Sequence, residues 1–127
     1  MYGCRIDRGI VAEGCVIGNA HIEKSVVGVR SIIGSGVQVR ESIVMGADFY
    51  ETSADKARDA AMNIPPVGIG AGSVIEKAIL DKNARIGEGV CITNDAGVVD
   101  TDGEGFYIRE GIVVIPKDGV LPDGMKI

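Results

Sequence analysis

An apolar residue returns at about every sixth position along most of this sequence, with small or polar residues between. Residues 25–39 and 78–92 align without a gap, and the apolar places of one segment recur in the other. These shared places are Val27, Ile33, Val39, Leu80, Ile86 and Ile92. The last segment resumes the spacing with Ile115, Leu121 and Ile127. Six residues are therefore a structural unit of this chain.

A longer repeat of about three sixes, one residue short, lies over this spacing and aligns the pairs Ile10-Val11, Val26-Val27 and Ile43-Val44. An α-helix needs apolar residues at three and four spacing, and a half-buried strand needs strict alternation, so neither fits. A period of six with glycine or a small polar residue after the apolar one is typical of a parallel β-helix with three short strands per coil. We predict an all-β chain of about five to six coils in which the six shared residues point inward.

Seven glycines fall where the coils of such a helix should turn. We expect each of them to adopt a positive φ, which glycine tolerates without a steric penalty. They are Gly28, Gly34, Gly36, Gly70, Gly72, Gly87 and Gly89.

Two stretches interrupt the period and are predicted to loop out of the coil stack, which leaves residues 1–127 as a single domain. The first excursion, at about residues 46–66, contains a predicted short helix with Ser53 as its N-cap and prolines after its end. The second, residues 93–110, is acidic and rich in turn residues until the string FYIR. The excursions hold four aromatic residues, which we expect to pack as lids on the coil wall: Phe49, Tyr50, Phe106 and Tyr107.

Composition narrows the classes of partner. The net charge of -5, with acidic and basic residues interspersed, gives no basic stripe for nucleic acid. No apolar run approaches the roughly 20 residues that cross a bilayer. The three cysteines, Cys4, Cys15 and Cys91, are odd in number and widely spaced, which favours reduced thiols in a cytosol-like compartment over a disulfide framework.

Four strings then point to a family: SVVGVRSII, MGADFYET, AILDKNARIGEGV and GFYIREGIVVIPKDGVLPDG. They closely resemble the C-terminal β-helix domain of glucose-1-phosphate adenylyltransferase (ADP-glucose pyrophosphorylase) of the plant and cyanobacterial type. The resemblance covers nearly the whole chain in order, including both excursions. It implies a left-handed β-helix, a hand that the period of six does not fix.

The resemblance also implies a function. Enzymes of that family make ADP-glucose from ATP and glucose 1-phosphate for starch or glycogen synthesis, and their catalytic site lies in an N-terminal nucleotidyltransferase domain with a glycine-rich loop. Nothing like that loop occurs in this sequence. The chain is therefore expected to be a regulatory and oligomerisation domain, inactive by itself, with no catalytic residue, metal or cofactor. Its implied partners are further copies of itself, a catalytic domain or sister subunits, and its implied location is the cytoplasm or the plastid stroma.

In that family this domain contributes to binding the activator 3-phosphoglycerate in competition with inhibitory phosphate. The two lysines that bind these anions match Lys82, in LDKNARIG, and Lys117, in GIVVIPKDG. Flexible ammonium groups suit a phosphate or a carboxylate. Each lysine follows an inward residue by two places, so both should lie at equivalent corners and could share one edge. Arg85 and Arg109 are weaker candidates, expected to be solvated or paired with acids of the loops.

Two alternatives remain open at this stage. The chain could be a freestanding structural β-helix, or a hexapeptide-repeat acyltransferase that uses its single histidine, His21. A zinc site of three histidines is disfavoured because each chain supplies one. His21 directly precedes the inward Ile22, and we expect it at a coil corner that faces solvent.

Overall fold

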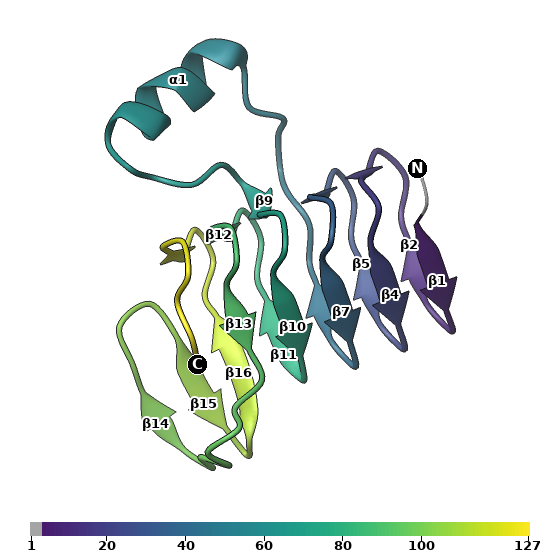
Figure 1. The fold of residues 1–127 in the computed structure, drawn as a ribbon, viewed down its shortest axis with the longest axis vertical. Coiled ribbons are helices and arrows are strands. Elements are labelled where there is room, and N and C mark those ends of the chain that lie inside the picture. The colour runs from purple at the N-terminus through teal and green to yellow at the C-terminus, as the bar shows by residue number, and fades with distance from the viewer. Residues whose placement is uncertain (1–3) are drawn as a thin grey trace.

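The computed structural model describes residues 4–127, which form a stack of parallel coils with three flat walls (Figure 1). The first wall has the strand order β1-β4-β7-β10-β13. Its strands are β1 (Arg5–Asp7), β4 (His21–Glu23), β7 (Gln38–Arg40), β10 (Val74–Glu76) and β13 (Cys91–Ile92). The third wall has the order β17-β12-β9-β6-β3. Its strands are β3 (Val16–Ile17), β6 (Ile32–Ile33), β9 (Gly68–Ile69), β12 (Arg85–Ile86) and β17 (Val120–Leu121).

The second wall is wider because two further strands extend it, in the order β14-β15-β16-β11-β8-β5-β2. The coils contribute β2 (Ile10–Val11), β5 (Val26–Val27), β8 (Ile43–Val44), β11 (Ala78–Leu80) and β16 (Ile112–Ile115). All pairings between coil strands in the three walls are parallel. Within residues 4–127 each wall thus receives five coil strands, in agreement with the predicted parallel β-helix.

Aliphatic side chains fill the interior of the stack in columns. Strand pairing places Val27, Val44, Leu80 and Ile115 one above the other on the second wall. The six residues predicted to point inward are each at most 2% exposed. The register read from the period of six is therefore confirmed.

The glycines at the corners have two different roles, and the sequence prediction was wrong for four of the seven. Gly36, Gly72 and Gly89 have positive φ, as predicted. The other four are Gly28, Gly34, Gly70 and Gly87, whose φ is not positive. A Cβ on any of these four would collide with the backbone of the next coil. At Gly28 it would lie 2.3 Å from the carbonyl oxygen of Met45. These glycines are required because two backbones approach closely.

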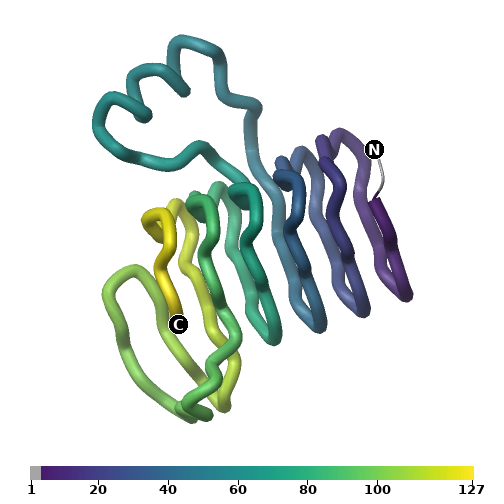
Figure 2. The backbone as a smooth tube through the Cα atoms, in the orientation of Figure 1, coloured from purple at the N-terminus to yellow at the C-terminus, as the bar shows by residue number. Residues whose placement is uncertain are grey.

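The first excursion leaves the stack after β8 and returns at β9, and it contains helix α1 (Ser53–Ala61), which stands over the third wall (Figures 1 and 2). The predicted helix is present, but its N-cap is Thr52 rather than Ser53. Thr52 and Asp55 form a capping box, in which each side chain accepts from the other residue's backbone N–H. The helix ends at its C-cap, Met62, and Asn63 turns the chain with a φ of 58° before the prolines are reached.

The second excursion is more ordered than predicted. The acidic, turn-rich stretch before FYIR includes a strand, β14 (Thr101–Asp102), and the string FYIR itself contributes β15 (Tyr107–Arg109). Both strands are antiparallel: β14 pairs with β15, and β15 pairs with the coil strand β16. Strand β15 lies between β14 and β16, and the hairpin of β14 and β15 continues the second wall beyond the coils.

The lid prediction for the aromatic residues is confirmed for Phe106, which is partly buried against the core. The other three, Phe49, Tyr50 and Tyr107, keep 46%, 53% and 42% of their surface exposed. Tyr50 nevertheless reaches the coil stack, where its hydroxyl donates to the Gly14 carbonyl oxygen. The three cysteines are partly buried free thiols. In the described part of the chain, no helix is long and apolar enough to span a membrane.

Candidate anion-binding site

The two candidate lysines lie at the same corner of neighbouring coils. Lys82 follows β11 and Lys117 follows β16, and these strands pair so that Leu80 lies opposite Ile115. The Asp118 N–H donates to the Lys82 carbonyl oxygen at 3.0 Å, which joins the two corners directly. The expectation that both lysines share one edge is confirmed, and we call this edge, with Lys82 and Lys117, the lysine edge.

Both ammonium groups converge on one carboxylate, that of Asp48. The Nζ atom of Lys82 is 3.3 Å from Oδ1 of Asp48, and Nζ of Lys117 is 3.8 Å from Oδ2. All three side chains remain 41–58% exposed. The cluster therefore holds two positive charges and one negative charge at a surface that dissolved anions can reach.

Asp48 belongs to the first excursion, and Asn83 of the coil fixes it in place. The Asp48 N–H donates to Oδ1 of Asn83 at 2.9 Å, and Nδ2 of Asn83 donates back to Oδ2 of Asp48 at 3.1 Å. The hydrogen bond from Asn83 is the main cause of an Asp48 pKa below its ordinary value, and Lys82 adds to this effect. Asp48 is consequently ionised at neutral pH.

Sequence reasoning did not identify Asp48 as part of this site. Asp48 lies in the string MGADFYET, which resembles the family, but the resemblance did not imply a role in anion binding for this aspartate. It is separated from Lys82 and Lys117 along the chain and reaches them only because the excursion folds back across the corner. No period or spacing predicts that path.

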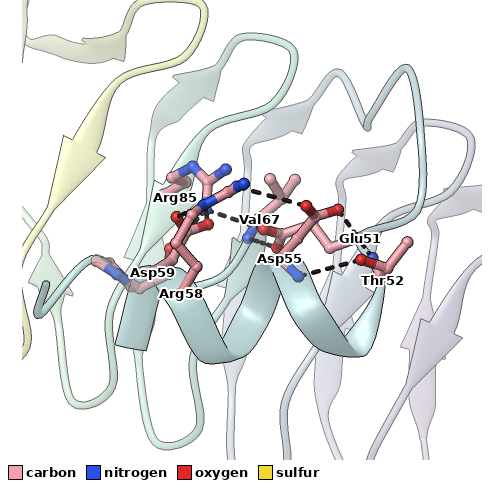
Figure 3. A network of polar contacts seen from close by, with 8 residues as sticks. Glu51, Thr52, Asp55, Arg58, Asp59, Val67 and Arg85 are labelled. Carbon is pink, nitrogen blue, oxygen red and sulfur yellow. Dashed lines mark hydrogen bonds and ion pairs between the residues drawn. The ribbon is translucent and has the colours of Figure 1, made fainter. Parts of the chain in front are cut away.

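Arg85 is not free to bind an anion, because the first excursion encloses it (Figure 3). Its Nη1 lies 3.1 Å from a carboxylate oxygen of Glu51 and 3.1 Å from one of Asp59, and it donates to the Pro65 carbonyl oxygen at 3.0 Å. The Glu51 and Asp59 side chains are only 3% and 8% exposed. We call Arg85, Glu51 and Asp59 the arginine clamp. It confirms the expectation that Arg85 pairs with acids of a loop.

Arg109, the other weaker candidate, is also paired with a loop acid. Its guanidinium bonds to the Asp102 carboxylate and donates to the Thr101 and Ile108 carbonyl oxygens, and it lies 5.6 Å from the centre of the Tyr107 ring. All these partners belong to the hairpin. Arg109 therefore stabilises the second excursion.

We expected His21 at a coil corner, and this was wrong. The residue begins strand β4 of the first wall. Its Nε2 lies 3.0 Å from Oδ2 of Asp7 on the neighbouring coil, and both side chains are partly exposed. The hydrogen bond with His21 is the main cause of a lowered Asp7 pKa. The shift arises because β1 and β4 place the two residues on the same wall. His21 and the lysine edge lie on different walls, so they do not form one site.

One comparison with known proteins bears on this fold. The family model described as the GLGC left-handed parallel beta-helix domain matches residues 1–126. The match includes all three walls and both excursions. It also supplies the hand of the helix, left, in agreement with the earlier expectation.

Proposed function

The chain belongs to the GLGC left-handed parallel β-helix domain family, the C-terminal domain of glucose-1-phosphate adenylyltransferase, and from that premise we propose that it is a regulatory and oligomerisation domain. In this proposal Lys82 and Lys117 bind phosphate and 3-phosphoglycerate. The parent enzyme is of the plant or cyanobacterial type, located in the cytoplasm or the plastid stroma, and a separate catalytic domain makes ADP-glucose.

The observation that supports anion binding is the convergence of two exposed ammonium groups from neighbouring coils. Each is already within 4 Å of a carboxylate oxygen, so the edge is shaped to hold negatively charged oxygen atoms. A phosphate group could accept hydrogen bonds from both lysines at once. Paired β-strands fix the two corners, so little backbone order has to be gained on binding.

We expect inorganic phosphate to bind this chain with a dissociation constant on the order of millimolar, because exposed ammonium groups give a salt-screened attraction. Binding should be lost in Lys82→Ala and in Lys117→Ala, and weakened by added sodium chloride. Nuclear magnetic resonance would follow the backbone amides of residues 81–84 and 115–119 during a phosphate titration.

Lys56→Ala is the matched control, since Lys56 is an exposed lysine of α1 and alanine favours a helix. This variant should titrate like the unchanged chain. Amide shifts that persist in a Lys82→Ala, Lys117→Ala double variant, or that occur only elsewhere, would show that the two lysines are ordinary surface charges.

Oligomerisation is supported by an apolar stripe along the outer face of the second wall. Strand pairing aligns Ile10, Val26, Ile43, Ile79 and Val114 across five coil strands. The first three are 67%, 41% and 44% exposed. Ile79 and Val114 are partly buried. A continuous row of aliphatic side chains on a flat sheet, exposed over three of its five strands, is typical of an interface between proteins. We propose that a second copy of the chain covers it.

Ile43→Lys should weaken self-association at least tenfold, because it places a charge in the middle of the stripe, where contact with a second copy would remove it from water. Sedimentation velocity over a range of protein concentrations would measure the change. Gln38→Lys is the control, since Gln38 is exposed on the first wall. A monomeric parent chain at high concentration, or equal weakening by both variants, would contradict this interface.

A further inference from the structure

The place where an anion would meet Lys82 and Lys117 is already held by a charged group of the chain itself, the Asp48 carboxylate. We propose that Asp48 is a built-in competitor, which lowers the affinity of the lysine edge for phosphate-bearing anions. This inference rests on the proposed function, because it concerns the regulation of the same site.

The position of Asp48 does not depend on the two lysines. Two hydrogen bonds with Asn83 fix its backbone and its carboxylate. The preceding residue, Ala47, donates its N–H to the Val29 carbonyl oxygen at 3.0 Å and accepts from Nε of Arg30 at 2.8 Å. The Asp48 carboxylate therefore stays beside the ammonium groups whether or not another anion approaches.

The excursion is also held beyond Asp48. Glu51, three residues later, belongs to the arginine clamp and accepts the N–H of Val67 at 2.6 Å. An arriving anion therefore has to share the two ammonium groups with a carboxylate that the fold keeps nearby. The effective concentration of the Asp48 carboxylate at the two lysines is high because Asp48 belongs to the same chain.

The electrostatic consequence follows from counting the charges in contact. With Asp48 ionised, the two lysines present one uncompensated positive charge, and without it they present two. Replacing the carboxylate by a neutral group should therefore strengthen the attraction for phosphate. It should also leave both ammonium groups free to donate to the same ligand.

Asp48→Asn tests this directly, because asparagine has the shape of aspartate and its amide oxygen can still accept from Asn83. We expect it to tighten the binding of inorganic phosphate by roughly three- to tenfold, the effect of removing one unit charge at contact distance in a solvent-exposed setting. In the same amide titration, binding should still be lost when Lys82→Ala or Lys117→Ala is added.

Asp118→Asn is the matched control for the change in net charge. Asp118 is exposed and directly follows Lys117, and its φ of 61° suits asparagine. This variant should change phosphate affinity by less than about twofold, because none of the ion pairs in residues 4–127 joins the Asp118 carboxylate to an ammonium group, and an exposed charge without such a contact interacts weakly through water.

Each outcome decides between the two proposals. Tighter, lysine-dependent binding in Asp48→Asn alone supports the inference. Lysine-dependent binding that is unchanged or weaker in Asp48→Asn overturns the inference and leaves the proposed anion site standing. Equal tightening by both variants overturns it as well, because net charge alone would then explain the effect. Phosphate shifts that ignore both lysines, or their absence in every variant, overturn the proposed anion site together with the inference.

Discussion

Arg85→Met is expected to lower the free energy of unfolding by about 3–5 kcal/mol, because it leaves two nearly buried carboxylates without their cationic partner. Glu51 and Asp59 are 3% and 8% exposed, and Nη1 of Arg85 is 3.1 Å from each. Arg58 contacts Asp59 from the helix surface, but it is 63% exposed and does not reach Glu51 in the described contacts. Urea unfolding followed by circular dichroism would measure the loss.

The matched control for this variant is Arg40→Met, which also removes an arginine from the outer face of a wall. Arg40 pairs with Glu76 at 3.0 Å, but both side chains are about one third or more exposed. Surface pairs of this kind contribute within about 1 kcal/mol. If the two variants lost equal stability, the arginine clamp would be no stronger than a surface ion pair.

Gly28→Ala should cost at least about 3 kcal/mol, since a methyl group there would force two coils apart. The added Cβ would lie 2.3 Å from the carbonyl oxygen of Met45 and 2.6 Å from its carbonyl carbon. Backbone cannot rotate aside as a flexible side chain could. The strand pairing of Val27 with Val44 lies directly beside this contact and should be disrupted with it.

Gly72→Ala provides the comparison, because it changes a corner glycine of the other kind. Gly72 has a φ of 73°, but a Cβ there would meet nothing within 4 Å. Only the left-handed backbone conformation disfavours alanine, at about 1 kcal/mol. Chemical denaturation of both variants should therefore rank Gly28→Ala as clearly more damaging, and the reverse order would refute the assignment of the two roles.

The contrast between these glycines shows what the sequence could predict and what it could not. The period of six correctly placed Val27, Leu80 and the other inward residues, because the direction of a side chain in a coil depends only on local spacing. The same pattern gave glycines at corners but not the reason for them. Residues other than glycine occupy many left-handed corners, among them Lys24, Glu41 and Lys77, with φ between 47° and 50°.

The part of the candidate site that lies at the coil corners could be predicted from the repeat. Lys82 and Lys117 stand at equivalent corners, so the repeat itself indicated that they would be neighbours. Asp48 and the arginine clamp were not predictable in this way, because they depend on how the first excursion folds back onto the stack. The capping box at Thr52 was a local signal that could have corrected the predicted N-cap, since the T-x-x-D spacing was present in the sequence.

The first excursion also alters the order in which the coils can assemble. Before it, the Ser42 N–H reaches back 17 residues to the Ser25 hydroxyl, whereas after it the Ala78 N–H reaches back 36 residues to the Ser42 hydroxyl. A stack in which each coil pairs only with the next can fold progressively from any nucleus. The second excursion makes a junction of the same kind, since Ala78 pairs with Val113, 35 residues later. At each of these two junctions the chain must close a loop about twice as long, at an extra entropic cost of about 0.6 kcal/mol, before pairing is regained. The two junctions thus divide the stack into three segments of consecutively paired coils. At the first junction, the contacts of Asp48 with Asn83 and of Arg85 with Glu51 tie the excursion to the coil that follows it.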